Sequence, residues 1–227
     1  MLWKEDGEMK SGDFVYIEYT AKVSDSGEIF DTTKEDVAKK EGIFNERIKY
    51  GPLPIIIDAG FTIAGLNDAI KEMNVGEKKK VSIPPEKAFG ERNEELVRLI
   101  PEARFKEQGV DVIPGSYVMV NNLRGKIISV EGGRVKVDFN HPLAGKTLEY
   151  DVEIVRKIED KEEKVKAIVN YFTGLEDVGV KIGEKEVEIE AKAEIEGRVK
   201  AAIASQIIKW IEGIETVKFV DVFKKSK

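Results

Sequence analysis

The sequence predicts an α+β protein in which a small antiparallel sheet packs on one short helix, a small β domain is inserted, and an α/β domain follows at the C-terminal end. Three observations predict this architecture. In the first 90 residues, short runs rich in aromatic and β-branched residues surround one segment with helical spacing. Between about residues 90 and 140, strand-like runs are separated by glycine and proline. After residue 160, helical and strand-like segments alternate.

Local patterns predict the elements of the first part. The run from Phe14 to Tyr19 alternates as a half-buried strand does, and apolar residues recur at helical spacing from Leu66 to Met73. Pro84-Pro85 ends the strand before it, because proline cannot donate to a sheet ladder. The predicted elements are a strand over 14–23, a turn at 25–27, a loop with a short helix over 34–46, a strand over 53–57, a helix over 66–73 and a strand over 78–84.

The same kinds of pattern predict the elements of the middle and last parts of the chain. Glu131-Gly132-Gly133 joins two strands as a hairpin. Asp160 opens a helix, because aspartate is a favoured N-cap, and we place a domain boundary there. Val187, Ile189, Ala191, Ala193 and Ile195 are expected to share one strand face. The predicted elements are strands over 117–120, 126–130, 134–139 and 148–158, then a helix over 161–172, a strand over 185–195, a helix over 198–210 and a strand over 216–223.

Composition excludes several classes of function. The chain has 227 residues with no cysteine and a single histidine, His141, so disulfides, thiolate or multi-histidine metal sites and cysteine nucleophiles are excluded. Serine triads lose their usual base, and no metal or cofactor is expected. The net charge is −6, and acidic and basic residues are interspersed along the chain rather than gathered into a basic region. This distribution argues against nucleic acid as a partner. Residues 1–12 carry five charges and no apolar run, so we expect no signal peptide, no membrane partner and a cytoplasmic location.

Six short motifs occur in a characteristic order. They are Gly12-Asp13-Phe14-Val15, Tyr19-Thr20-Ala21, Gly27-Glu28-Ile29-Phe30-Asp31, Gly65-Leu66, Met73-Asn74-Val75-Gly76-Glu77 and Ile83-Pro84-Pro85-Glu86-Lys87-Ala88-Phe89-Gly90. In this order they resemble the FKBP family of peptidyl-prolyl isomerases. The segment from Gly90 to about Asp138 stands where short members have a flap loop, and the chain returns through 140–148. That arrangement looks like the SlyD-like, long archaeal members, whose insert-in-flap domain binds unfolded chains.

The resemblance covers about residues 10–158 and implies a domain organisation. Residues 1–89 and 140–158 would form the FKBP-type isomerase domain, and residues 90–139 the insert-in-flap chaperone domain. Residues 160–227 would form a C-terminal α/β domain, in which we find no motif that indicates a role.

The resemblance also implies a site for the proline ring. Phe30, Leu66 and Tyr150 would form its walls and floor, Tyr19 and Asp31 its polar edge, and the backbone N–H of Ile63 would donate to a substrate carbonyl. The remaining residues implied around this pocket are Leu53, Thr62, Ala88, Phe89, His141 and Leu143. Short members have tryptophan at the Leu66 position, phenylalanine at Leu53 and tyrosine at Phe89. The last difference removes a hydroxyl donor and argues against tight macrolide binding more than against isomerase activity.

The predicted function is a peptidyl-prolyl isomerase with chaperone activity, acting on unfolded or partly folded polypeptides that contain X-Pro bonds. The alternative is a non-catalytic chaperone or assembly module on the same fold. A metallochaperone would need a tail rich in histidine and cysteine, and residues 223–227 have neither. The apolar residues of the insert fit either a binding surface or an ordinary core: Val110, Val112, Ile113, Tyr117, Met119, Ile127 and Val135.

A homodimer through the C-terminal domain is a further prediction. The helix there carries Ile203, Ile207, Ile208, Trp210 and Ile211, which is much apolar surface for a unit of about 65 residues to bury alone. A self-sufficient monomeric domain is the alternative.

Overall fold

The computed structural model describes residues 9–222 and divides into two compact units. The first comprises residues 1–83 and 148–227, and the second residues 84–147. The C-terminal helices and strands therefore group with the N-terminal sheet. In the part of the chain that the structure describes, no helix has the length and apolar character needed to cross a membrane.

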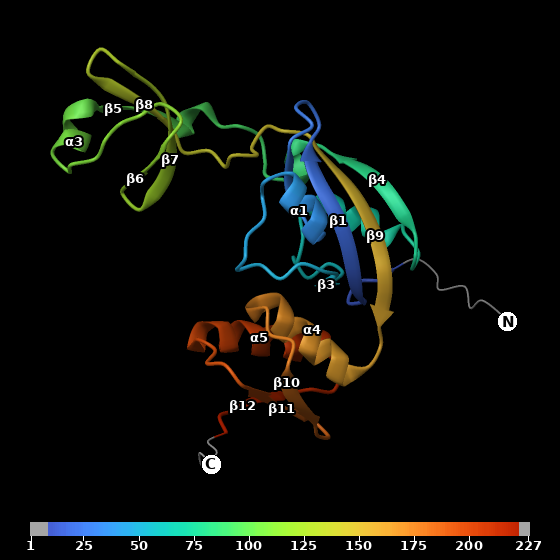
Figure 1. Ribbon diagram of the computed structural model, residues 1–227. Coiled ribbons are helices and arrows are strands. Elements are labelled where there is room, and N and C mark those ends of the chain that lie inside the picture. Colours follow the sequence, from blue (N-terminus) through green and yellow to red (C-terminus); the bar gives the residue numbers. More distant parts are fainter. Residues whose placement is uncertain (1–8, 223–227) are drawn as a thin grey trace. The chain divides into compact units, whose positions relative to one another are not determined.

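A five-stranded antiparallel sheet is the centre of the first unit, and the long strands β1 and β9 run side by side through it (Figure 1). Its strand order is β2-β1-β9-β4, and β3 pairs with the other half of the same edge of β1. Helix α2 supplies Leu66 and Ile70 to the core. The elements are β1 (Phe14–Val23), β2 (Ile29–Thr32), α1 (Glu35–Lys40), β3 (Leu53–Ile56), α2 (Ala64–Lys71), β4 (Lys78–Ile83) and β9 (Leu148–Ile158).

The prediction missed strand β2 because it has only four residues and its pairing with β1 is irregular. A register shift between Ala21 and Lys22 leaves Ile29 opposite Lys22 and Asp31 opposite Ala21. Such a shift breaks the strict alternation by which a strand is detected in a sequence. The consequence for the site is direct, because β2 carries both Phe30 and Asp31.

The second unit contains a four-stranded antiparallel sheet of order β5-β8-β7-β6. Gly132 and Gly133 have φ values of 55° and 72°, which suits the predicted two-residue hairpin between β7 and β8. The prediction omitted β5 and α3, because Pro101 and dense charge obscure both patterns. The elements are η1 (Pro85–Lys87), η2 (Glu94–Leu96), β5 (Val97–Pro101), α3 (Glu102–Lys106), β6 (Tyr117–Val120), β7 (Leu123–Glu131) and β8 (Arg134–Asp138).

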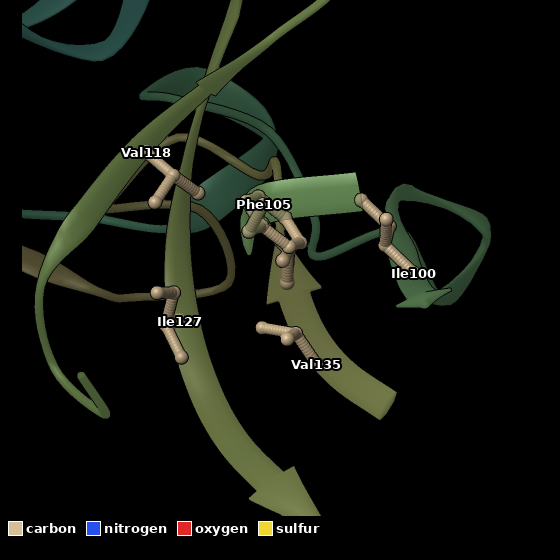
Figure 2. Packing of buried hydrophobic residues seen from close by; sticks show 6 residues of the cluster. Ile100, Phe105, Val118, Ile127 and Val135 are labelled. Atoms are coloured by element: carbon tan, nitrogen blue, oxygen red, sulfur yellow. The ribbon is translucent and has the colours of Figure 1, made fainter. Parts of the chain in front are cut away.

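The insert has a hydrophobic core of its own (Figure 2). Phe105 of α3 lies among side chains from the sheet, and Ile127 and Val135 are fully buried. Gly125 is required in β7, since a Cβ there would come within 2.4 Å of Val137 Cγ1. The second unit therefore has the packing of a small folded domain rather than of a loop.

The C-terminal elements form a three-stranded sheet of order β10-β11-β12, with α4 and α5 on one face (Figure 1). Strands β11 and β12 are parallel because α5 connects them. Asp160 caps α4 as predicted, accepting from the backbone N–H of Glu163 at 2.8 Å. The elements are α4 (Lys161–Thr173), β10 (Val178–Ile182), β11 (Glu186–Ala191), α5 (Gly197–Trp210) and β12 (Thr216–Val220).

Two details of the C-terminal prediction are wrong. The predicted strand over 185–195 ends at Ala191, so Ala193 is exposed beyond the sheet, and Ile195 is buried outside any strand. Strand β10 was missed because Gly179 interrupts its short apolar run. The end of the predicted strand over 216–223 lies partly outside the described residues, and β12 ends at Val220.

Candidate functional site

Three strands of the first unit bring together four of the predicted site residues. Tyr19 comes from β1, Phe30 and Asp31 from β2, and Tyr150 from β9. Ala21 faces both Asp31 and Tyr150 as a cross-strand partner, and its small side chain leaves room between them. The site is therefore assembled by strand pairing between segments more than 100 residues apart.

A hydrogen bond and two ring contacts hold this cluster in place. The Tyr19 hydroxyl donates to Asp31 Oδ2 at 2.7 Å. The rings of Tyr19 and Tyr150 lie 5.5 Å apart between centroids, and the Phe30 ring meets Tyr150 edge-on at 6.2 Å. Tyr150 is buried, whereas Asp31 is exposed. The arrangement gives an aromatic wall with one carboxylate at its rim.

Burial and a nearby carboxylate keep both tyrosines neutral. Burial raises the pKa of Tyr19 far above its ordinary value, and the charge of Asp31 and its hydrogen bond raise it further. Burial also raises the pKa of Tyr150, with a smaller contribution from Asp31. Both hydroxyls therefore remain protonated at neutral pH, so neither acts as a base in this site.

The N-terminus of α2 supplies the predicted floor and a backbone donor. Leu66 is buried in the first turn, and Ile63 is the extended N-cap residue with φ −63° and ψ 150°. The carbonyl of Ile63 accepts from Leu66 and Asn67. Within residues 9–222, no acceptor engages the backbone N–H of Ile63. That N–H is thus available to a ligand, as the prediction requires.

The loop before α2 is anchored at its start by Asp58. Asp58 Oδ1 accepts from Asn67 Nδ2 at 2.6 Å, and Asn67 Oδ1 accepts from the Asp58 N–H at 2.9 Å. The Asn67 and Lys71 hydrogen bonds lower the pKa of Asp58. Asp58 itself has a φ of 63°, a conformation that aspartate tolerates better than most residues. This anchor fixes the approach of the chain to Thr62 and Ile63.

Four of the predicted site residues, Ala88, Phe89, His141 and Leu143, lie in the second unit. The rings of Phe89 and His141 stack with centroids 4.2 Å apart and planes 4° apart. His141 Nδ1 accepts from the backbone N–H of Leu143 at 3.2 Å, and Ala88 directly precedes Phe89. The second unit thus joins Phe89, His141 and Leu143 into one local arrangement.

The sequence reasoning missed an aromatic cluster beside Thr62 and Ile63. The Phe61 ring lies 4.0 Å from the Tyr171 ring and 6.0 Å from the Phe172 ring, and the Tyr171 hydroxyl donates to the Phe61 carbonyl at 3.0 Å. Tyr171 and Phe172 belong to α4 of the C-terminal part. No local motif indicates this contact, because it depends on how α4 packs against β3.

The carboxylates near the site are engaged with neighbouring side chains. No group of three or more histidine, cysteine, aspartate or glutamate residues in 9–222 is arranged to hold an ion. Asp31 accepts from Tyr19, and Asp58 accepts from Asn67.

Comparison with known proteins places these features in a family. Residues 98–143 match the model described as FKBP26, IF domain, and residues 161–224 match the model described as FKBP26_C-terminal. The short-type peptidyl-prolyl cis-trans isomerase of Methanocaldococcus jannaschii is 36% identical over 156 residues, which cover 69% of this chain and 98% of that protein. A probable FKBP-type isomerase of Pseudomonas fluorescens is 37% identical over 109 residues, 46% of this chain and 71% of that protein.

A third relative is also an FKBP-type isomerase. The FKBP-type isomerase SlyD of Helicobacter pylori is 31% identical over 129 residues, which cover 55% of this chain and 69% of that protein. The M. jannaschii relative is matched over nearly its whole length, and both additional domains of this chain match FKBP26 models. The chain therefore belongs to the FKBP-type peptidyl-prolyl cis-trans isomerases, as a long archaeal-type member.

Proposed function

We propose that this protein catalyses cis-trans isomerisation of X-Pro bonds in unfolded and partly folded polypeptides, and that its insert holds those chains. The observation that carries the proposal is the cluster of Tyr19, Phe30, Asp31 and Tyr150, which lies on the same unit as the unengaged N–H of Ile63. Family membership supports the same activity.

The uncatalysed reaction is slow because the partial double bond of the amide must be broken. The barrier is about 18 to 20 kcal/mol, and no nucleophile or proton transfer is required. A protein lowers this barrier by binding the twisted amide better than either planar form, and about 1.36 kcal/mol of such preference is worth tenfold in rate. The twisted amide has lost its resonance and is less polar, so an apolar pocket favours it.

Each residue of the proposed pocket has a role in this scheme. Phe30, Tyr150 and Leu66 would contact the proline ring and exclude water. Ile63 would donate its N–H to a substrate carbonyl and fix the peptide while the amide rotates. The Tyr19 hydroxyl, held by Asp31, would form the polar edge. Ala88, Phe89, His141, Leu143, Leu53 and Thr62 are proposed as further substrate contacts.

The insert offers an apolar surface for unfolded chains. Ile127 and Val135 form its core, and Val112 packs against that core. The other apolar residues noted in the sequence are exposed: Val110, Ile113, Tyr117 and Met119. Leu99 and Leu123, which are also exposed, line a groove of about 210 Å³. These exposed apolar side chains support the proposal that the insert binds unfolded chains.

The test is a pair of assays on the full chain. An isomerase accelerates exchange in a short X-Pro peptide and also the refolding of a proline-limited protein. The alternative, a non-catalytic chaperone, suppresses aggregation of unfolded protein while leaving the peptide exchange rate unchanged. Absence of acceleration on every peptide tested would refute the enzymatic proposal.

A homodimer through the C-terminal domain stays a prediction. The protomer buries Ile203, Ile207 and Ile211, and Trp210 lies against Gly12, where an added Cβ would stand 3.3 Å from the indole ring. Ile208 remains exposed. A dimer would therefore rely on Ile208 and the sheet edges rather than on the whole apolar face of α5.

Sedimentation of the full chain and of residues 1–158 tests this prediction. A dimer for the full chain and a monomer for the shorter chain is the expected result, because the proposed contact lies in the C-terminal part. Ile208→Asp in the full chain adds a milder test, since it changes one exposed side chain. A monomeric full chain at micromolar concentration would rule the dimer out.

A further inference from the structure

A groove of about 410 Å³ lies in the first unit between residues 47–54 and the C-terminal end of α4. One wall contains Ile48, Tyr50 and Leu53, and the other contains Asn170 and Tyr171. This volume is within the range of about 300 to 1,000 Å³ that is usual for ligand clefts. No residue of the groove belongs to the insert.

Both walls are held in place by local contacts. The Tyr50 hydroxyl accepts from the Asn45 N–H at 3.0 Å, and the Tyr50 ring stacks on Phe44. On the other wall, the Thr173 hydroxyl donates to the Val169 carbonyl at 2.7 Å. The groove is therefore ordered before any ligand arrives, which limits the entropy lost on binding.

An ion pair joins the two walls at the rim. Lys49 from one wall pairs with Glu176, which follows α4. Both side chains are largely exposed, so the pair contributes little to stability. It does place one charge of each sign beside the groove, where the polar backbone of a peptide would lie.

Two residues link the groove to the proposed isomerase pocket. Leu53 lines the groove and is also a predicted pocket wall. Tyr171 lines the groove, and its hydroxyl donates to the carbonyl of Phe61, which directly precedes Thr62 and Ile63. Tyr171 also contributes to raising the pKa of Tyr19, as expected if the two hydroxyls lie in the same region.

We infer that this groove is a second subsite, which binds the residues of the substrate polypeptide that flank the X-Pro bond. The inference rests on the proposed isomerase function. Leu53 is common to the groove and the proposed pocket, and Tyr171 contacts Phe61, two residues before Ile63, so residues that flank an X-Pro bond held at the Ile63 N–H would lie toward the groove. Ile48, Tyr50 and Pro52 present apolar contacts, so apolar flanking side chains are favoured. The C-terminal part would thereby contribute to substrate selection.

The test compares two peptides with the same central X-Pro bond, one of four residues and one of twelve with apolar flanks. Ile48→Asp is the informative variant, because this groove side chain is 55% exposed and contributes little to the fold. We expect it to lower kcat/KM on the long peptide about tenfold, mainly through KM, because it removes an apolar contact made on binding. The rate on the four-residue peptide should not change.

The matched control is Ile182→Asp, which places the same substitution at a 38% exposed isoleucine in β10, outside the groove. The control should leave both rates unchanged. Equal rates of wild type and Ile48→Asp on the long peptide would overturn the subsite, and so would equal losses on both peptides. A wild-type protein inactive on both peptides would instead refute the isomerase function. If Ile48→Asp converts a dimer to a monomer, the groove is a subunit interface and the inference is wrong.

Discussion

Asp31→Ala is expected to lower kcat/KM on short X-Pro peptides at least tenfold while the protein stays folded. Asp31 is exposed, so its removal leaves no cavity in the core. It does remove the acceptor of the Tyr19 hydroxyl at 2.7 Å and the polar edge of the proposed pocket. A loss of about 1.36 kcal/mol of preference for the twisted amide corresponds to the tenfold effect. Exchange spectroscopy on a peptide and thermal unfolding of the variant measure the two quantities.

The matched control is Asp151→Ala. Asp151 is an exposed aspartate of β9 that pairs with Thr20, so its side chain points to the sheet face opposite Tyr150. The same change of charge and size there should leave the peptide rate unchanged. If both variants lose activity equally, the effect of Asp31→Ala is electrostatic at long range and not a property of the site.

Tyr150→Ala is expected to lower activity at least as much as Asp31→Ala, but it also affects the stability of the fold. Tyr150 is only 5% exposed, so its truncation removes core packing and costs about 3 to 5 kcal/mol of stability. We therefore expect Tyr150→Ala, unlike Asp31→Ala, to lower the free energy of unfolding. Tyr150→Phe keeps the ring and should keep most of the activity. Unchanged peptide rates in both Asp31→Ala and Tyr150→Ala would refute the proposed site.

Long, regular strands are predictable from the sequence, whereas short, irregular ones are not. Strands β1 and β9 have ten and eleven residues, and their predicted bounds are confirmed. Strands β2 and β10 have four and five residues, and each is disturbed, by a register shift in one case and by Gly179 in the other. Short irregular strands form because a neighbouring strand pairs with them, which a local pattern does not contain.

The candidate site was also predicted from the sequence only in part. The family resemblance is enough to name Tyr19, Phe30, Asp31 and Tyr150, which the structure brings into contact. The contact of Tyr171 with Phe61 was not predicted. It arises from packing of α4 on β3, between segments that share no motif, and only the folded chain reveals it.

Replacing residues 91–138 with a short flexible loop is expected to leave peptide isomerisation largely intact and to cut catalysis of protein refolding by at least tenfold. A short peptide needs only the pocket, whereas an unfolded chain gains from a second contact that raises its local concentration. The buried residues of the insert's core all lie within residues 91–138, so the replacement removes that core as a whole (Figure 2). Rates on a four-residue peptide and on a proline-limited protein measure the two effects.

The structure shows why such a replacement is practicable. The Gly145 N–H donates to the Gly90 carbonyl at 2.8 Å, so the two connecting segments already meet at the base of the insert. Just beyond it, Asn140 Oδ1 accepts from the Asn93 N–H at 2.9 Å. A short loop between Gly90 and Phe139 therefore joins two segments that already pair with each other at the base of the insert.

A milder variant separates loss of the binding surface from loss of the whole domain. Ile113→Ser with Met119→Ser changes two side chains that are 61% and 62% exposed and leaves the buried core of Phe105, Ile127 and Val135 untouched. If exposed apolar residues hold unfolded chains, this double variant loses much of the refolding activity and keeps the peptide rate. Refolding catalysed equally well by the wild type, the loop replacement and the double variant would mean that the insert has no part in binding unfolded chains.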